Sequence, residues 1–252
     1  MIENLFRLDG KVAVLTGASS GFGVRFGRVL AEAGATVVLA ARRYDAIRDL
    51  AASLPSALAV ACDVTSEEAC ADLVARTMAE YGRIDVLVNN AGISQAVKVE
   101  HESTESFRNI LEVNLVAPFR LSRMVGTHMV AAGRGSIVNI GSIIGVVGVG
   151  RMPQGSYAAS KGGVTNLTRE LAAQWARKNV RVNAIAPGFF PTEMTGELFA
   201  SERGQAWVGE LTPMGRGGRE GELDGALLFL ASDASSYVTG SVLTVDGGWT
   251  AV

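Results

Sequence analysis

Short apolar runs rich in valine, isoleucine and alanine recur along the chain, and each ends at a small or polar residue. Runs of about four to eight such residues are typical of strands that are buried on both faces. They predict strands at 12–15, 36–40, 57–62, 84–88, 136–140, 180–186 and 242–245.

Between these runs, apolar residues recur with the spacing of a helix face. This spacing predicts helices over 24–33, 44–53, 66–81, 105–131, 157–178 and 220–230. Pro118 falls inside the longest of them and is expected to bend it, because proline cannot donate a main-chain hydrogen bond. The alternation predicts an α/β fold of the Rossmann type: a doubly wound, mostly parallel, seven-stranded sheet with helices on both faces.

No change in composition and no low-complexity linker divides the chain, so residues 1–252 are expected to form a single domain. The region 187–211 is expected to be irregular or locally helical, and long regions of this kind are often lids or binding loops. It carries large apolar side chains, as does its continuation to residue 214. We therefore expect the region from about 189 to 214 to bind a substrate that is hydrophobic or bulky.

Charge and cysteine content limit the classes of partner. The 252 residues include 23 basic and 25 acidic side chains, and a net charge of -2 gives no electrostatic basis for binding nucleic acid or a membrane. No window of about 18 residues is apolar enough to predict a transmembrane helix, and the charged stretch 1–10 does not resemble a signal peptide. Cys62 and Cys70 lack metal-ligand spacing, which favours a cytoplasmic protein without a metal site.

A glycine-rich turn follows the first predicted strand directly. The stretch 16–23 contains Gly17, Gly21 and Gly23 in the pattern G-x-x-x-G-x-G. Glycines let the main chain approach a phosphate, and the following helix N-terminus supplies N–H donors and a positive dipole. The same residues also suit a tight turn without a ligand, so the position at the start of a βαβ unit is what favours phosphate binding.

Three further strand ends carry small or polar residues: Asp63, the Asn-Asn-Ala-Gly run at 89–92, and the pair Gly141-Ser142. In an open parallel sheet, ligands bind beyond the carboxyl ends of the strands. Each of these residues could instead cap a helix, but several in register favour one shared site.

Tyr157 and Lys161 are four residues apart, which places both on one face of the predicted helix. A phenol beside an ammonium group is a plausible acid–base pair, because a nearby cation lowers the tyrosine pKa from about 10. Taken alone, such a pair is more often a surface feature of an amphipathic helix.

Together these motifs resemble the classical short-chain dehydrogenase/reductase family over essentially the whole chain. The resemblance rests on motifs in the order expected for that family: 16–23, Asp63-Val64, 89–92, Asn114, Ser142, Tyr157 with Lys161, Pro187-Gly188 and the ending 238–248. It implies a dinucleotide-binding and catalytic domain that transfers a hydride between a nicotinamide cofactor and a small-molecule carbonyl compound or secondary alcohol.

The resemblance implies catalytic roles for four residues. Tyr157 would be the general acid or base, a role worth about 10²–10⁴-fold in rate, and Lys161 would lower its pKa and bind the nicotinamide ribose. Ser142 would hydrogen-bond the substrate oxygen, and Asn114 would help hold a relay water near Lys161. Fourteen residues separate Ser142 from Tyr157, more than is common in the family. Ser142 is preferred to Ser156 because it follows a strand, whereas Ser156 would point about 100° away from Tyr157 on the helix.

The resemblance also implies a cofactor site made by the glycine turn, the strand ends and the catalytic helix. Its residues would be Gly17, Ser19, Ser20, Gly21, Phe22, Gly23, Arg42, Arg43, Asp63, Val64, Asn90, Ala91, Gly92, Tyr157, Lys161, Pro187, Gly188 and Thr192.

The end of the second predicted strand indicates which cofactor is used. Ala41 stands where an acidic residue would bind the adenosine ribose and repel a 2′-phosphate, and Arg42 and Arg43 follow it. A guanidinium group suits phosphate. We therefore predict a preference for NADP(H), with Arg42 as the main contact and Arg43 as the second, and with NAD(H) as the alternative cofactor. In the alternative interpretation, both arginines are solvated residues at the start of a helix, and the prediction of an NADP(H) preference has no basis.

Two other functions are compatible with the sequence. A 3-oxoacyl-thioester (acyl carrier protein) reductase would use the same chemistry, and Arg151, Arg203, Arg216 and Arg219 could supply a basic docking patch. A non-catalytic nucleotide-binding regulator would keep the fold but is expected to lack the Tyr or Lys of the site. The resemblance further implies a homotetramer or homodimer, in which the helices 105–131 and 156–178 pack against their symmetry mates.

Overall fold

A seven-stranded sheet forms the centre of residues 4–252, the part of the chain that this computed structural model describes. Residues 1–3 of the charged N-terminal stretch lie outside it. The strands are β1 (Val12–Thr16), β2 (Thr36–Ala41), β3 (Ala57–Ala61), β4 (Val86–Asn89), β5 (Gly135–Ile140), β6 (Val180–Pro187) and β7 (Val242–Val245). Their order across the sheet is β3-β2-β1-β4-β5-β6-β7, and each pairing between neighbours is parallel. The predicted doubly wound fold is confirmed, with a sheet that is wholly rather than mostly parallel over the described residues.

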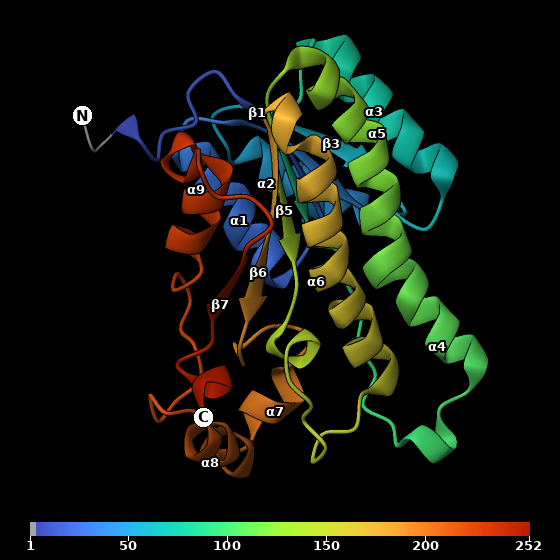
Figure 1. Ribbon diagram of the computed structural model, residues 1–252, viewed down its shortest axis with the longest axis vertical. Helices are drawn as coiled ribbons and strands as arrows, with labels where there is room; N and C mark the ends of the chain where they lie inside the picture. The colour runs from blue at the N-terminus through green and yellow to red at the C-terminus, as the bar shows by residue number, and fades with distance from the viewer. Residues whose placement is uncertain (1–3) are drawn as a thin grey trace.

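Helices cover both faces of this sheet (Figure 1). They are α1 (Gly21–Glu32), α2 (Tyr44–Ala52), α3 (Glu67–Tyr81), α4 (Thr104–Leu111), α5 (Ala117–Ala132), α6 (Gly155–Trp175), α7 (Gly196–Ala200), α8 (Glu202–Leu211) and α9 (Asp224–Ala231). Short 3₁₀ turns are η2 (Val99–His101), η4 (Ile143–Gly145), η5 (Ala176–Lys178), η6 (Asp233–Ser235) and η7 (Trp249–Ala251). Helices α1, α2 and α9 contribute to the core on one face of the sheet, and α3, α5 and α6 to the core on the other.

Alternate residues of β1 point into these two cores. Ala13 and Leu15 lie in the core beneath α1 and α9, whereas Val12 and Val14 lie in the core beneath α3 and α5. Successive side chains of a strand point to opposite faces. Because both faces are covered, the strands are continuous apolar runs in the sequence rather than alternating ones.

The long predicted helix is divided into two helices just before Pro118. Helices α4 and α5 are joined by a π-helical turn, η3 (Glu112–Val116), in which the main-chain N–H of Ala117 donates to the carbonyl of Glu112, five residues earlier. Pro118 is the second residue of α5, directly after this turn. The hydrogen-bond pattern already changes there, so the missing N–H of proline is tolerated.

Two predicted helix starts differ from the structure by three or four residues. Helix α1 begins at Gly21, within the glycine turn, rather than at residue 24, because glycine adopts the required main-chain geometry without strain. Helix α9 begins at Asp224 rather than at residue 220. The region 187–211 is locally helical, as expected: it contains α7 and α8, which lie below the carboxyl ends of β5 and β6 in Figure 1.

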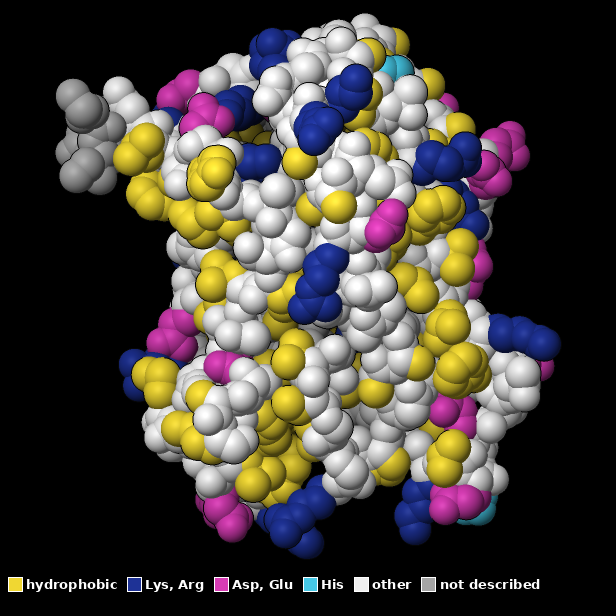
Figure 2. Space-filling model, in the orientation of Figure 1, with side chains coloured by type: hydrophobic (Ala, Val, Ile, Leu, Met, Phe, Trp, Pro, Cys, Tyr) yellow, Lys and Arg dark blue, Asp and Glu magenta, His cyan; other side chains and the backbone are white. Residues whose placement is uncertain are grey.

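The surface carries charges of both signs. Figure 2 shows Lys and Arg side chains spread over one face of the molecule, with Asp and Glu side chains among them. Among the residues that the structure describes, no helix has both the length and the apolar character needed to cross a membrane.

Candidate active site

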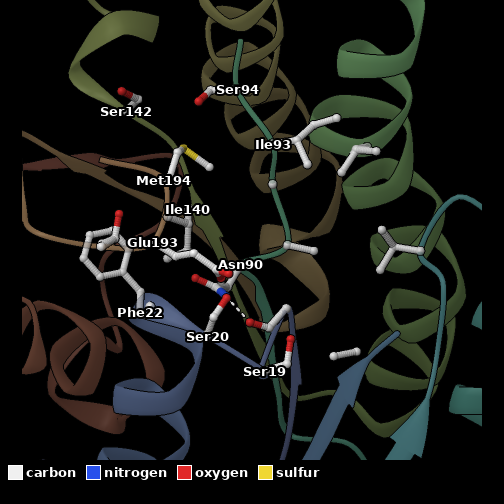
Figure 3. A pocket seen from close by; sticks show the side chains of 18 of the residues that line it. Ser19, Ser20, Phe22, Asn90, Ile93, Ser94, Ile140, Ser142, Glu193 and Met194 are labelled. Carbon is white, nitrogen blue, oxygen red and sulfur yellow. Dashed lines mark hydrogen bonds between the residues drawn. The ribbon is translucent and has the colours of Figure 1, made fainter. Parts of the chain in front are cut away.

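A pocket of about 720 Å³ opens at the carboxyl ends of the strands. Its lining comes from the glycine turn after β1, from residues that follow β2 to β6, and from α6 (Figure 3). All the residues predicted to bind the cofactor line this pocket except Gly23, and the predicted catalytic residues line it except Asn114. The sequence therefore identified residues that the fold brings together from seven separate segments.

The glycine turn fits closely against the end of β4. Gly17 has a φ of 65°, and a Cβ atom there would lie 2.8 Å from the Cα of Ala91. The Asn90 side-chain nitrogen donates to the carbonyls of Thr16 and Gly17, at 2.9 and 3.2 Å. Gly23 lies behind the turn, where a Cβ atom would meet the Gly17 carbonyl oxygen at 2.1 Å. Gly23 thus allows the turn to pack on its own helix and does not face the pocket.

The end of β3 supplies an anchored carboxylate. Asp63 accepts hydrogen bonds from the main-chain N–H of Thr65 at 3.0 Å and from its hydroxyl at 2.8 Å. These bonds hold the pKa of Asp63 below its usual value. The loop that presents Val64 to the pocket is therefore fixed on the side where the adenine is expected.

Tyr157 and Lys161 face the other end of the pocket from α6. The Lys161 Nζ donates to the Ile140 carbonyl at 2.7 Å and lies 5.6 Å from the centroid of the Tyr157 ring. Burial lowers the pKa of Lys161 to about 8. Burial also raises the pKa of the Tyr157 hydroxyl, and a hydrogen bond with Ser142 offsets part of that shift. The tyrosine pKa therefore moves opposite to the direction expected from the sequence, because burial outweighs the hydrogen bond with Ser142.

Ser142 lies next to Tyr157 despite the lengthened loop. It is buried, lines the pocket and accepts a hydrogen bond from the main-chain N–H of Ile144 at 3.1 Å. The turn after it packs on the main chain of α6, since a Cβ atom at Gly145 would lie 2.5 Å from the carbonyl carbon of Lys161. Ser156 is also buried, but its hydroxyl donates to the Glu102 carboxylate and it does not line the pocket. The extra residues of the loop thus leave Ser142 in place, because η4 holds its beginning against α6.

Asn114 supports the site from behind. It is buried in the π-helical turn η3, where its Oδ1 accepts from the N–H of Ile93 at 2.9 Å and its Nδ2 donates to the Ile93 carbonyl at 2.8 Å. The Nδ2 also donates to Ser160 at 3.1 Å. A Cβ atom at Gly92 would lie 3.4 Å from the Asn114 Oδ1 and 3.7 Å from the Lys161 Nζ. Asn114 therefore fixes the main chain that lines the pocket beside Lys161.

The two arginines after β2 differ in their contacts. Both line the pocket, but the Arg43 guanidinium binds Glu193 through two hydrogen bonds of 3.1 and 3.0 Å. Arg43 also donates to Ser19 at 3.1 Å. Arg42 lies at the pocket without such a hydrogen bond among the contacts of residues 4–252.

Sequence reasoning missed several residues of the lining, among them Ser94, Glu193 and Met194 (Figure 3). Glu193 directly follows the predicted Thr192, so its place in the chain was a usable signal. Its partner Arg43 is 150 residues away, and no local pattern joins the two. Over the described residues, no group of three or more His, Cys, Asp and Glu side chains is placed to hold a metal ion.

The segment after β6 closes the nicotinamide end predicted from the sequence. Pro187 and Gly188 line the pocket, and a Cβ atom at Gly188 would lie 2.8 Å from the Cα of Asp246. Thr192 lies over the glycine turn, 3.6 Å from where a Cβ atom of Gly21 would be. The main-chain N–H of Thr192 donates to the Thr195 hydroxyl at 2.9 Å, which fixes this part of the segment.

Known proteins match this chain along almost its whole length. A family model described as enoyl-(acyl carrier protein) reductase matches residues 17–250. Galactitol 2-dehydrogenase (L-tagatose-forming) from Cereibacter sphaeroides is 44% identical, over 98% of each chain. The crystal structure of a short-chain type dehydrogenase/reductase from Mycobacterium marinum aligns with a TM-score of 0.95 and 36% identity, over 100% of both chains. A gluconate 5-dehydrogenase from Burkholderia cenocepacia J2315, in complex with NADP and tartrate, aligns with a TM-score of 0.94 and 36% identity, also over 100% of both chains.

Proposed function

The chain belongs to the classical short-chain dehydrogenase/reductase family, and on that premise we propose that it is an NADP-dependent oxidoreductase acting on a carbonyl compound or secondary alcohol. One observation carries this proposal. The side chains of Ser142, Tyr157 and Lys161 line one end of the pocket whose other end is formed by the glycine turn and Arg42. A proton donor and a dinucleotide site thus share one cavity.

The residues present fit a nicotinamide dinucleotide. Gly17 and Gly21 have positive φ values and carry no side chain into the pocket, so the main chain can approach a pyrophosphate. Helix α1 begins at this turn, and its N-terminal N–H groups and dipole favour a negative group. When bound, the cofactor supplies the hydride, which moves between its nicotinamide ring and the substrate carbon.

In this proposal Tyr157 transfers the proton. Because burial raises its pKa, the hydroxyl is protonated at neutral pH and can donate to the carbonyl oxygen during reduction. In the oxidation direction, the side chain must first lose this proton, and the phenolate oxygen then accepts the proton of the alcohol. Ser142, hydrogen-bonded to Tyr157, orients the substrate oxygen beside the phenol. Lys161 holds its charge near the ring and binds the ribose, with its position set by the Ile140 carbonyl.

The preference for NADP(H) rests on the residues after β2. Ala41 provides no carboxylate to repel a 2′-phosphate, and Arg42 lines the pocket beside it. The complex of the Burkholderia gluconate 5-dehydrogenase with NADP supports the same choice. We assign Arg42 as the main contact to the 2′-phosphate.

The substrate class is proposed at the level of the reacting group. The names of the galactitol and gluconate dehydrogenases support a secondary alcohol and its ketone. An apolar cluster packs against Tyr157, with Ile143, Ile144, Phe189 and Val208 at its buried centre. This cluster supports a substrate with an apolar face beside its carbonyl carbon.

A spectrophotometric screen tests the proposed function. The protein is incubated with NADPH and a panel of open-chain and cyclic ketones, and with NADP⁺ and polyols, sugar acids and cyclic alcohols, while the absorbance of NADPH is followed. The proposal expects hydride transfer with at least one member, and loss of it in Tyr157→Phe. Absence of transfer across the panel, together with intact dinucleotide binding, would favour the non-catalytic regulator instead.

The acyl carrier protein alternative is supported by the description of the matching family model and by a 40% identical relative, 3-oxoacyl-(acyl-carrier-protein) reductase from Thermotoga maritima. The docking patch that it would need is weakened in the structure. Both terminal nitrogens of the Arg216 guanidinium donate to Glu222, at 2.8 and 2.7 Å, and the main-chain N–H of Arg219 also donates to Glu222. Activity with an acetoacetyl thioester of the carrier would favour this alternative.

Assembly into a homodimer or homotetramer is part of the proposal. Val116 at the end of η3 is 36% exposed and Phe119 in α5 is 47% exposed. Apolar side chains of this size on a helix surface are often covered by a second subunit. Light scattering of the purified protein measures the oligomeric state directly.

A further inference from the structure

An ion pair joins the two sides of the dinucleotide pocket. Arg43 follows β2 at the start of α2, and Glu193 lies in the segment after β6 that leads to α7. Their side chains meet through two hydrogen bonds of 3.1 and 3.0 Å, and both residues line the pocket. This contact therefore connects the cofactor side of the site with the segment that leads to the substrate side.

The Glu193 carboxylate lies at the phosphate-binding turn. Figure 3 shows its side chain directed toward Ser20. Hydrogen bonds from Arg43 first, and then from Ser20, lower the pKa of Glu193 to about 2. A carboxylate in this position repels a pyrophosphate unless a cation neutralises it. Arg43 provides that cation, and it also donates to Ser19 of the same turn at 3.1 Å.

Other residues of the segment that carries Glu193 also pack against the walls of the pocket. The ring of Phe190 packs edge-on against that of Phe22 in α1, with centroids 5.6 Å apart. Further along, Leu198 and Phe199 pack in the apolar cluster that contains Tyr157. Opening the contact between Arg43 and Glu193 would thus loosen a segment that spans both halves of the pocket.

Given the proposed function, on which this inference rests, we propose that Arg43 and Glu193 form a clasp that holds residues 190–195 over the bound dinucleotide and limits its release. Arg43 then acts mainly on Glu193 rather than on the 2′-phosphate. The clasp serves NADP(H) and NAD(H) alike, because it closes over the part that the two cofactors share. Arg42 alone distinguishes between them.

Dissociation rates of NADPH and NADH test the clasp. They are measured by stopped-flow fluorescence after displacement by excess oxidised cofactor. Since the ion pair is exposed to solvent and therefore weak, Glu193→Gln should release both cofactors only about two- to fivefold faster. Arg43→Ala should release both about tenfold faster, because the carboxylate is then left without its cation. In the double variant, removal of the carboxylate should restore the rate to about that of Glu193→Gln alone.

A second measurement requires no cofactor. Amide hydrogen exchange in residues 190–200 should be faster in Glu193→Gln and in Arg43→Ala than in the unaltered protein. Arg48→Ala is the matched control, because Arg48 forms exposed ion pairs with Asp45 and Asp49 on the same helix and does not line the pocket. It should change neither the release rates nor the exchange.

Three results would overturn the clasp. If Arg43→Ala released NADPH faster but left the release rate of NADH unchanged, Arg43 would be a ligand of the 2′-phosphate. Slower NADPH release in Glu193→Gln would show that the carboxylate competes with phosphate for Arg43. Equal release rates in all variants would show that the contact does not restrain the cofactor. If the unaltered protein binds neither dinucleotide, the proposed function itself fails, and the clasp with it.

Discussion

The amino group of Lys161 donates a 2.7 Å hydrogen bond to the main-chain carbonyl of Ile140, the last residue of β5. Helix α6, which carries the proposed catalytic pair, is thereby joined to the sheet at the point where the strand ends and Ser142 begins the next turn. The same contact keeps a buried ammonium group 5.6 Å from the ring of Tyr157. The position of the lysine is therefore set by the sheet rather than by the tyrosine.

Burial of Lys161 should make the stability of the protein depend on pH. Its pKa falls from the ordinary 10.5 to about 8 in the folded state. Between these values the unfolded chain binds a proton that the folded chain does not, so the free energy of unfolding rises with pH. The cost of burying the cation is fully present below about pH 8.

Lys161→Met removes this dependence. We compare the free energy of unfolding of the unaltered protein with that of the variant. Between pH 7 and pH 10.5 this difference should change by up to about 3 kcal/mol in favour of the unaltered protein. Urea unfolding at several pH values measures the shift, with Lys98→Met at an exposed site as the control. A constant difference across this range would contradict the prediction.

Tyr157→Phe should abolish proton transfer while leaving the pocket intact. We expect kcat to fall by about 10²–10⁴-fold, because the phenol supplies general acid–base catalysis. The Kd for NADPH, measured by fluorescence, should change little, since the ring remains in its place. Full activity in this variant would exclude Tyr157 as the proton donor.

Arg42→Ala should change the choice of cofactor. We expect kcat/KM with NADPH to fall about tenfold or more, since a charge-assisted contact to the 2′-phosphate is lost, while the value with NADH is nearly unchanged. The ratio of the two values is the relevant measurement, with Arg48→Ala again as the control. An equal loss with both cofactors would show that Arg42 does not read the 2′-phosphate.

Gly145→Ala should change the position of Ser142 indirectly, by moving the turn that follows it. The new Cβ atom would lie 2.5 Å from the Lys161 carbonyl carbon and 2.6 Å from its oxygen, so the turn that follows Ser142 must move away from α6. We expect a loss of about 1–3 kcal/mol in the free energy of unfolding and a clear fall in kcat. Gly148→Ala is the matched control, since no atom lies within 4 Å of its added Cβ. Similar behaviour of the two variants would mean that the turn does not position Ser142.

Much of this site could be predicted because its signals are local. A run such as 12–15 identifies a strand by its composition, and the glycines that follow mark a turn with special main-chain geometry. Tyr157 and Lys161 need only the spacing of a helix. Asp63 and Ser142 come directly after strands, and the parallel sheet brings such residues to one edge.

The remaining features depend on contacts that no local pattern contains. The π-helical turn before Pro118 was not predicted, and in it Asn114 is held by Ile93, twenty-one residues earlier in the chain. The pairing of Arg43 with Glu193 joins residues 150 positions apart. The direction of the Tyr157 pKa shift depends on burial, which is a property of the folded chain rather than of the residue spacing.

The π-helical turn η3 makes the site sensitive to the length of the chain. Such a turn contains one residue more than an α-helix needs over the same distance. Deleting one residue between Glu112 and Val116 would restore regular α-helical geometry while α4 and α5 stay close to their present positions. The bulged turn would be lost, and with it the geometry that lets the residue at position 114 hold both main-chain groups of Ile93. The number of residues between α4 and α5 is therefore set by the contacts of Asn114 at the site, and not only by the packing of the two helices.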